Sequence, residues 1–256
     1  MGQSYARRPT QSGHDHAHES EAEHAAHDAD HLHATPSLEQ GTGRGREVDH
    51  TTGAEIDAFI QQDEFFNYYI RSSFDGQGNG ADGHVNILSH EQYQARWVQY
   101  AMARINPNTS ARFTEAEALA YGTNAFVDGT QIFIHQGRGE PATAIHESMH
   151  LFTDGSYLRE MGFNINEGTT EFFTRLLCSR IGVRRGRGFY ADQFRVMEEV
   201  VEALPQGHNV LASAYFDGNI SRLREAMNEG EGNEQRYEQW KAAMQAGNFR
   251  SARALF

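Results

Sequence analysis

The chain contains only one cysteine, Cys178, so a framework of disulfides within the chain is excluded. Apolar residues surround Cys178 in the sequence, and we therefore expect its thiol to lie in the core. No apolar run is long enough to span a bilayer, and the N-terminus has no hydrophobic segment of the kind that secretory signals contain. We expect a chain that is made as a soluble cytoplasmic protein without membrane insertion, and whose export would require a dedicated secretion system.

Positive charge is also scarce. The chain has 22 Lys and Arg against 35 Asp and Glu, which gives a net charge of −13. Binding to phosphate backbones needs clustered Lys and Arg, so this composition argues against nucleic acid as a partner. The one short basic cluster is predicted to be a solvated loop and contains Arg184, Arg185 and Arg187.

Large apolar side chains are almost absent from residues 1–46. Such a segment cannot bury enough surface to offset the entropy lost on ordering, so we predict a disordered N-terminal tail and one ordered domain over 47–256. Seven histidines lie between His14 and His33, interleaved with Asp and Glu. Three interpretations remain open: a solvated low-complexity tail, a segment that buffers or delivers zinc, nickel or copper, and a targeting or loading signal.

The ordered part is predicted to have an α+β fold that is mostly helical, with a small β-sheet. Alternating patterns predict a strand over 84–88 and a hairpin with strands 125–127 and 131–135. Asn166 is the predicted N-cap of a helix, because its side chain can accept a hydrogen bond from a backbone N–H. Apolar periodicity predicts helices over approximately 53–71, 89–105, 115–124, 141–153, 167–182, 191–204, 208–216, 219–228 and 233–246.

The segment His146-Glu147-Ser148-Met149-His150 carries the clearest chemical signal in the chain. Residues four apart share one face of a helix, so His146 and His150 can bind the same metal ion. Glu147 follows the first histidine and can reach a water molecule beside that ion. The sequence therefore predicts a metal site with an adjacent carboxylate that can act as a base.

A third ligand is expected from Asn166-Glu167-Gly168-Thr169-Thr170-Glu171. Glu167 is the predicted ligand, and two His with one Glu leave an open position for water, as in catalytic zinc sites. Glu171 lies one helical turn beyond Glu167 and is predicted to accept a hydrogen bond from His146. Asn166 is also expected to contact the ligand residues and support them without binding the metal itself.

Other residues near the motif can be compared as third ligands by their spacing from it. The long zinc-protease motif with a third histidine is excluded, because Thr153 and Ser156 occupy the positions that it requires. Asp154 is too close in sequence to turn back easily onto the same metal. Glu160, in the connecting segment, stays open as an alternative ligand.

The pairing of His146–His150 with Asn166–Glu171 resembles the gluzincin branch of zinc metallopeptidases, the thermolysin-like group. That group combines HExxH with a downstream Asn-Glu and an acid four residues later; Glu171 stands where thermolysin itself has Asp. The stretch 131–175 also resembles small bacterial peptidase-like domains among polymorphic toxins and effectors of contractile injection systems, and Ala214–Gly218 is similar to that group. The resemblance covers roughly residues 125–225.

The resemblance implies a zincin-like metallopeptidase domain that uses one catalytic Zn²⁺ to hydrolyse peptide bonds in a protein or peptide substrate. It also implies a secretion or injection apparatus, or an inhibitor protein, as partners of such a toxin or effector protease. Glu147 would take the proton of the attacking water and pass it to the leaving amine.

A hydrogen-bond donor is needed for the oxyanion that develops during hydrolysis. The candidates are Tyr190, Tyr215, Tyr157 and His208. We favour Tyr190, because it stands at the start of the helix after the ligand helix, where related peptidases often place a tyrosine.

The strand that contains Gln131, Ile132, Phe133 and Ile134 is expected to bind the substrate backbone by strand addition at its edge. Two other classes of function remain open. One is a non-catalytic zinc-binding interaction protein that retains the metal site, and the other is a metal-handling protein that acts through its His-rich tail. The substrate is open as well, and includes a host protein, a competitor's protein and the chain's own tail.

Overall fold

A computed structural model describes residues 49–74, 80–106, 109–121, 123–185, 190–230 and 232–256. The predicted N-terminal tail, with its seven histidines, lies outside the described residues. Within these ranges, no helix combines the length and the apolar composition that crossing a membrane requires.

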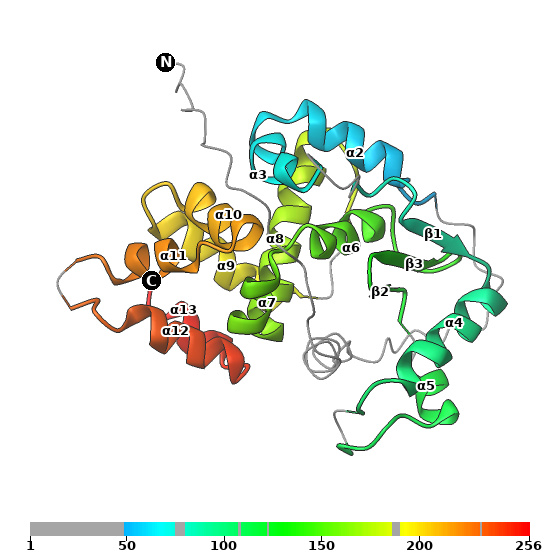
Figure 1. Ribbon diagram of the computed structural model, residues 1–256. Helices are drawn as coiled ribbons and strands as arrows, with labels where there is room; N and C mark the ends of the chain where they lie inside the picture. Colours follow the sequence, from blue (N-terminus) through cyan, green and yellow to red (C-terminus); the bar gives the residue numbers. More distant parts are fainter. Residues whose placement is uncertain (1–48, 75–79, 107–108, 122, 186–189, 231) are drawn as a thin grey trace.

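The sheet contains three strands in the order β1-β3-β2 (Figure 1). β1 (Val85–Leu88) pairs in parallel with β3 (Gln131–His135), and β2 (Ala125–Asp128) pairs antiparallel with β3. Gly129 has a φ of +60° in the tight turn between β2 and β3, a conformation that glycine adopts without strain. The predicted hairpin and small sheet are therefore confirmed.

β3 is the central strand, and this contradicts the prediction that Gln131–Ile134 offers an edge to a substrate. The backbone of β3 pairs on both sides, so that Ile134 lies opposite Ile87 on β1 and Ala125 on β2. A substrate strand cannot add where both edges are already paired. β2 pairs with β3 alone among the described strands, and its second edge is not paired with a strand.

The rest of the described chain is helical, which confirms the predicted α+β class with mostly helical content. The first helices are α2 (Gly53–Gln62), α3 (Glu64–Phe74), α4 (His90–Met102) and α5 (Glu115–Tyr121). After the sheet come α6 (Thr143–Leu151), α7 (Gly155–Met161) and α8 (Phe163–Ile181). The C-terminal part contains α9 (Ala191–Ala203), α10 (Gly207–Asp217), α11 (Ile220–Asn228), α12 (Arg236–Gln245) and α13 (Phe249–Arg253).

Two short helices, α7 and α13, lie outside the predicted set. The motif helix α6 ends at Leu151, and Asp154 is the N-cap of α7, where its Oδ1 accepts the N–H of Ser156 at 2.8 Å. Helices of one or two turns contain too few residues for an apolar period to be recognised in the sequence.

α8 begins four residues earlier than predicted, and this corrects the role of Asn166. The backbone N–H of Asn166 donates to the carbonyl of Gly162 at 3.1 Å, so Asn166 is inside the helix and is not its N-cap. Gly162 occupies the N-cap position with a φ of +71°, in the left-handed region that favours glycine. The side chain of Asn166 can therefore serve the interior of the protein.

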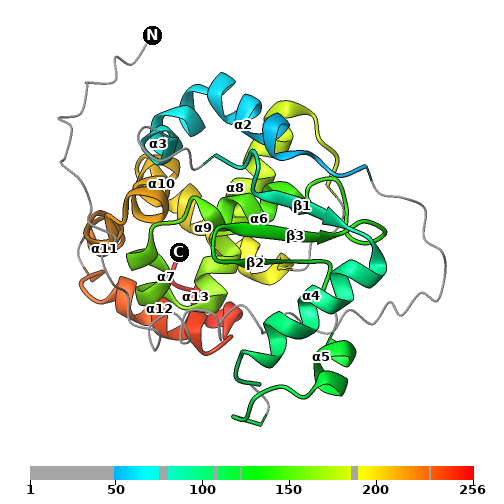
Figure 2. The ribbon, with the colours of Figure 1, turned by 45° about the vertical axis from the view of Figure 1, so that its right-hand side comes forward.

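α8 forms the centre of the larger hydrophobic core. It packs against α6, α7, α9 and α12, and Figures 1 and 2 show helices around it. Phe173, Leu177 and Cys178 are buried on α8, which confirms the predicted core thiol. Gly168 permits the close approach of α9, because a Cβ at this position would lie 3.0 Å from both Cβ and the carbonyl oxygen of Gln193.

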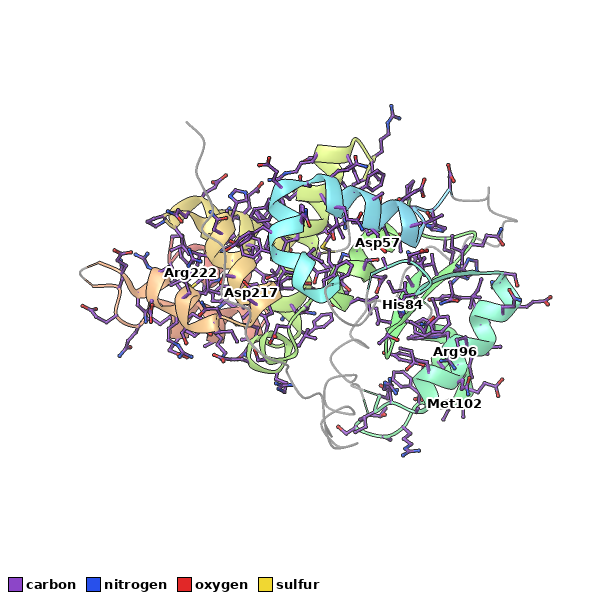
Figure 3. All side chains as sticks on the ribbon, turned by 45° about the horizontal axis from the view of Figure 1, so that its top comes forward. Asp57, His84, Arg96, Met102, Asp217 and Arg222 are labelled. Atoms are coloured by element: carbon purple, nitrogen blue, oxygen red, sulfur yellow. The ribbon has the colours of Figure 1, made fainter. Side chains whose placement is uncertain are left out.

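A smaller aromatic cluster joins α4, α5 and β2. The indole Nε1 of Trp97 donates to the carbonyl of Ala118 at 2.6 Å, and Arg96 on α4 forms an ion pair with Asp128 on β2 at 2.7 Å (Arg96 is labelled in Figure 3). These contacts join α4 to α5 and to β2, and β2 also packs against α6. The cluster consists of Tyr93, Trp97, Tyr100, Ala101, Phe113, Ala118 and Phe126.

His135 ends β3, just before the turn that leads into α6. Its buried Nδ1 accepts the N–H of Gly137 at 3.0 Å, and its Nε2 lies 2.9 Å from Nδ1 of His90. Burial, together with the charge of Arg138 and the neighbouring His90, lowers the pKa of His135 to about 4. In the folded chain, the ring of His135 is therefore neutral above about pH 4.

We expect the free energy of unfolding to decrease as the pH is lowered from about 6.5 to about 4. The unfolded chain protonates His135 near its ordinary pKa of 6.5, whereas the folded chain does so only near 4, so protons favour unfolding in this window. The contribution of His135 is complete above this window and amounts to no more than a few kcal/mol. Urea unfolding at several pH values should give a steeper pH dependence for the wild type than for His135→Gln, and equal slopes would contradict this expectation.

Candidate metal centre

His146 and His150 lie on one face of α6, as the spacing predicts. Their rings are nearly perpendicular, with centroids 5.0 Å apart, and each residue is 8% exposed. On an adjacent face of the helix, Ile145 and Met149 are fully buried in the core. The packing of this apolar side turns both imidazoles toward α8.

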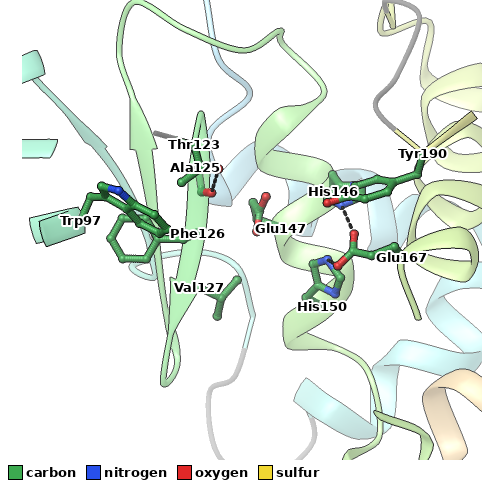
Figure 4. A pocket seen from close by; sticks show the side chains of 10 residues that line it. All are labelled: Trp97, Thr123, Ala125, Phe126, Val127, His146, Glu147, His150, Glu167 and Tyr190. Atoms are coloured by element: carbon green, nitrogen blue, oxygen red, sulfur yellow. Dashed lines mark hydrogen bonds and ion pairs between the residues drawn. The ribbon is translucent and has the colours of Figure 1, made fainter. Parts of the chain in front are cut away.

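Glu167, on α8, lies between the two histidines. Its Oε2 is 3.3 Å from Nε2 of His146, and its Oε1 is 3.5 Å from Nε2 of His150 (Figure 4). Each of the three residues offers one ligand atom, and these atoms all lie within 4.8 Å of one another. Tetrahedral zinc with ligands at 2.0–2.1 Å brings ligand atoms about 3.3 Å apart, so this buried group can hold a metal ion of that type.

The outer ring nitrogens of the two histidines both face side chains on α8. Oε2 of Glu171 lies 3.5 Å from Nδ1 of His146, on the predicted side of the ring, but this nitrogen makes no hydrogen bond within the described residues. Nδ1 of His150 lies 3.2 Å from Nδ2 of Asn166 and 3.3 Å from Oγ1 of Thr170. Partners of this kind fix the orientation of the ring and leave Nε2 available to a metal.

Asn166 can also fix the tautomer of His150. Its Oδ1 is buried without a hydrogen-bond partner within the described chain, while Nδ2 is next to the ring. A half-turn of the amide would let Oδ1 accept the Nδ1–H of His150, which satisfies the oxygen and leaves a lone pair on Nε2. The sequence predicts a supporting role for Asn166, and the partner that the structure provides is His150.

The electrostatics of this group favour positive charge within it. Burial alone lowers the pKa of His146, but its contacts with Glu167 and Glu171 outweigh burial and raise the pKa to about 9. Burial raises the pKa of Glu167, yet the two histidines hold it well below its usual range. Anionic Glu167 thus favours positive charge among the three residues, and a divalent cation can supply that charge.

Glu147 and the metal group line one cavity of about 50 Å³, which has room for a metal ion and a few waters. Figure 4 shows Glu147 between β2 and the two histidines. Burial raises the pKa of Glu147 and outweighs the opposing effect of His146 and His150. The remaining lining residues are Trp97, Thr123, Ala125, Phe126, Val127 and Tyr190.

Tyr190 is the one oxyanion candidate of the four that lines this cavity. Its ring stacks on His146, with centroids 5.7 Å apart and an interplanar angle of 10°. Burial and the nearby charges of Glu167 and Glu147 raise the pKa of Tyr190 well above its usual value, so its hydroxyl keeps a proton to donate. Tyr190 immediately precedes α9, as the sequence predicts.

The other three candidates lie away from this cavity: Tyr215 and Tyr157 are in the core, and His208 is exposed. The hydroxyl of Tyr215 donates to the carbonyl of Met149 at 3.1 Å and lies 2.6 Å from Oγ1 of Thr170, behind the ligand helix. Tyr157 is fully buried, and its hydroxyl lies 2.8 Å from Oγ1 of Thr169. His208 packs against Phe172.

The alternative metal ligands have other partners. Asp154 caps α7, and Oε1 of Glu160 accepts hydrogen bonds from the hydroxyl of Tyr237 and from Arg224, each at 3.0 Å. These contacts tie α7 to α11 and α12. Glu167 is therefore the third member of the group.

One prediction about charge was wrong. Arg184 is exposed, but the side chain of Arg185 is only 12% exposed and forms an ion pair with Glu171. The prediction follows from the fact that short basic stretches are usually exposed to solvent. Nothing in the sequence indicates that one of these arginines points into the interior.

The lining of the cavity also differs from the sequence prediction. Gln131–Ile134 of β3 are not among the lining residues, whereas Ala125, Phe126 and Val127 of β2 are. The reason is the strand order, which puts β2 on the side of the metal group. Apolar alternation identifies both strands of the hairpin but does not tell which one has an outer edge.

The chain matches no protein-family model, no curated protein and no solved structure.

Proposed function

We propose that this chain is a zinc-dependent endopeptidase of the gluzincin type. The observation that carries the proposal is that Glu147 shares one buried cavity with the ligand group His146, His150 and Glu167. A closed structural zinc site has four protein ligands, whereas three ligands beside a carboxylate suit a catalytic site. The supporting contacts of Glu171 and Asn166 agree with the resemblance seen in the sequence.

In the proposed reaction, each group around the cavity has its own role. Zinc, when bound, would lower the pKa of water toward neutrality and polarise the peptide carbonyl. Glu147 accepts the proton of the attacking water and passes it to the leaving amine. The raised pKa of Glu147 suits this exchange, because a carboxyl group that titrates nearer to neutrality can both take and return a proton.

Tyr190 supplies the hydrogen-bond donor for the oxyanion. Its protonated hydroxyl belongs to a ring that is held flat against His146, so the donor is placed beside the metal before substrate arrives. Donors that are fixed in advance stabilise developing charge without a cost of reorganisation.

The proposed seat of the substrate backbone is β2. Ala125, Phe126 and Val127 line the cavity, and β2 has an edge that no described strand pairs with. An extended peptide on this edge would lie across the cavity, with its carbonyl groups facing Glu147 and the ligand group. This replaces the predicted role of β3.

The resemblance to toxin and effector domains makes a bacterial toxin or effector protease the favoured setting, with an injection apparatus or an inhibitor protein as partner. The direct test is to identify new protein N-termini after exposing a proteome to the wild type or to Glu147→Gln. Cleavages that appear only with the wild type would identify substrates. A wild type that holds zinc but cleaves neither proteins nor a broad peptide library would favour the non-catalytic zinc-binding alternative.

The metal-handling alternative is tested on the full chain. Replacement of the seven tail histidines by asparagine should leave one zinc per chain after dialysis and change hydrolysis by less than about twofold, because the ligands lie on α6 and α8. Zinc is measured by mass spectrometry on protein of known concentration. Loss of most of the bound metal in this variant would favour a protein that acts through its tail.

A further inference from the structure

Glu171 is a fully buried carboxylate with three positively charged or protonatable neighbours. Its Oε2 lies 3.5 Å from Nδ1 of His146 and also accepts a hydrogen bond from Nη2 of Arg185. Its Oε1 accepts from Nε of Arg175 at 2.7 Å. Of the two arginines, Arg185 is the more buried, with a side chain 12% exposed against 30% for Arg175.

Arg185 shares one oxygen of Glu171 with a metal ligand, whereas Arg175 binds the other oxygen. The guanidinium of Arg175 also lies 3.9 Å from the ring centroid of Phe194, toward α9. The position of Glu171 against His146 is therefore set chiefly by Arg185.

Arg185 also reaches the start of the motif helix. Its Nε lies 3.7 Å from Oε1 of Glu140, whose backbone N–H and carbonyl both bond to Thr143, the first residue of α6. The arginine thus joins α8, through Glu171, to the beginning of α6. The segment that carries it leads to Tyr190, whose ring stacks on His146.

We infer that Arg185 is a positioning residue of the metal centre, which holds Glu171 against His146 and ties the two ligand helices together. The inference rests on the metal site of the proposed function and is independent of peptide hydrolysis. A buried carboxylate that loses its closest cation is left uncompensated and shifts toward its remaining partner, here Arg175. This shift would take Oε2 of Glu171 away from the ring of His146.

The planar fork of arginine is needed for this role. Nη2 binds Glu171 on α8 while Nε faces Glu140 in the segment just before α6, so two carboxylates from separate parts of the chain share one guanidinium. Lysine carries a single ammonium group and cannot reproduce both contacts with the same geometry.

The test is a double-mutant cycle on the full-length chain, with zinc affinity measured by competition with a chromophoric chelator. Arg185→Met should weaken zinc binding about 10- to 100-fold, the usual effect of removing a residue that supports a ligand. Arg185→Lys should fall between this variant and the wild type. Arg184→Met, at the exposed neighbouring position, is the matched control and should stay within about twofold of the wild type.

The cycle is completed by Glu171→Gln and by the variant with both changes. If Arg185 acts through Glu171, Arg185→Met should cost less than about threefold in the Glu171→Gln background. If Arg185→Met alone fails to fold, Arg185→Lys, which keeps a positive charge beside Glu171, replaces it at both corners of the cycle. The visible absorption of the Co²⁺-substituted protein should change with Arg185→Met and not with Arg184→Met.

Equal costs of Arg185→Met in both backgrounds would overturn the inference, as would a folded Arg185→Met protein with the zinc affinity of the wild type. A wild-type chain that binds no zinc would overturn the metal site and the inference together. Failure of the wild type to hydrolyse peptides, with zinc bound and the cycle coupled as expected, would contradict the proposed function alone.

Discussion

Glu147→Gln should reduce peptide hydrolysis by about 10²- to 10⁴-fold and leave one zinc bound per chain. Glutamine has nearly the same shape as glutamate but cannot accept the proton of the attacking water. Glu147 is not among the residues whose ligand atoms converge on the metal position, so its replacement leaves that group intact. Hydrolysis is measured on a fluorogenic peptide mixture, and zinc by mass spectrometry on the same preparations.

The matched control is Glu160→Gln, which makes the same chemical change on α7. Glu160 accepts hydrogen bonds from Tyr237 and Arg224 and does not line the cavity, so this variant should keep both zinc and activity. It also tests the alternative ligand that the sequence leaves open. Undiminished hydrolysis by Glu147→Gln would remove the general-base role from this residue.

The part of the centre that depends on local geometry could be predicted from the sequence. Residues four apart on a helix meet on one face whatever surrounds the helix, so His146 and His150 follow from their spacing and from the apolar residues Ile145 and Met149 beside them. Glu167 is on another helix, and its assignment required the resemblance as well as the pattern. The structure brings its carboxylate to both histidines.

The errors arise where tertiary structure overrides local preference. Asn166 is a good N-cap by residue type, but Gly162 starts α8 one turn earlier and leaves the amide facing His150. Strand order is set by packing between distant segments, so the hairpin could be predicted and the place of β3 in the middle of the sheet could not.

Polar residues that turn inward are the other class that sequence patterns miss. Arg185 belongs to a stretch that looks solvated, and Thr170 has no predicted role, because apolar periodicity assigns polar residues to the surface. Both are drawn inside by buried groups that need partners: Thr170 by Nδ1 of His150, and Arg185 by the carboxylate of Glu171. A metal centre is where such exceptions gather, since its ligands must be oriented by hydrogen bonds.

Glu167→Gln should lose zinc, and this result separates the ligand from the base. Glu147 and Glu167 line the same buried cavity, and each substitution replaces one carboxylate by its amide. Only Glu167 lies within 3.5 Å of a ring nitrogen of both His146 and His150, and the neutral amide is a much weaker ligand for zinc. Removing a residue that supports a ligand lowers zinc affinity by at most roughly 100-fold. We expect Glu167→Gln to lower it by more than this, and we expect the zinc affinity of Glu147→Gln to stay near that of the wild type.

The comparison is made by chelator competition at one pH, followed by hydrolysis assays at increasing zinc. Activity of Glu167→Gln should recover in part as zinc is raised, because Glu147 and Tyr190 remain in place, whereas activity of Glu147→Gln should not respond. If the two variants bind zinc equally tightly, Glu167 is not a ligand, and the arrangement of α6 against α8 would need another explanation. If both variants lose zinc, Glu147 belongs to the metal-binding group and cannot be the base. The relative zinc affinities of the two variants therefore decide which chemistry this cavity supports.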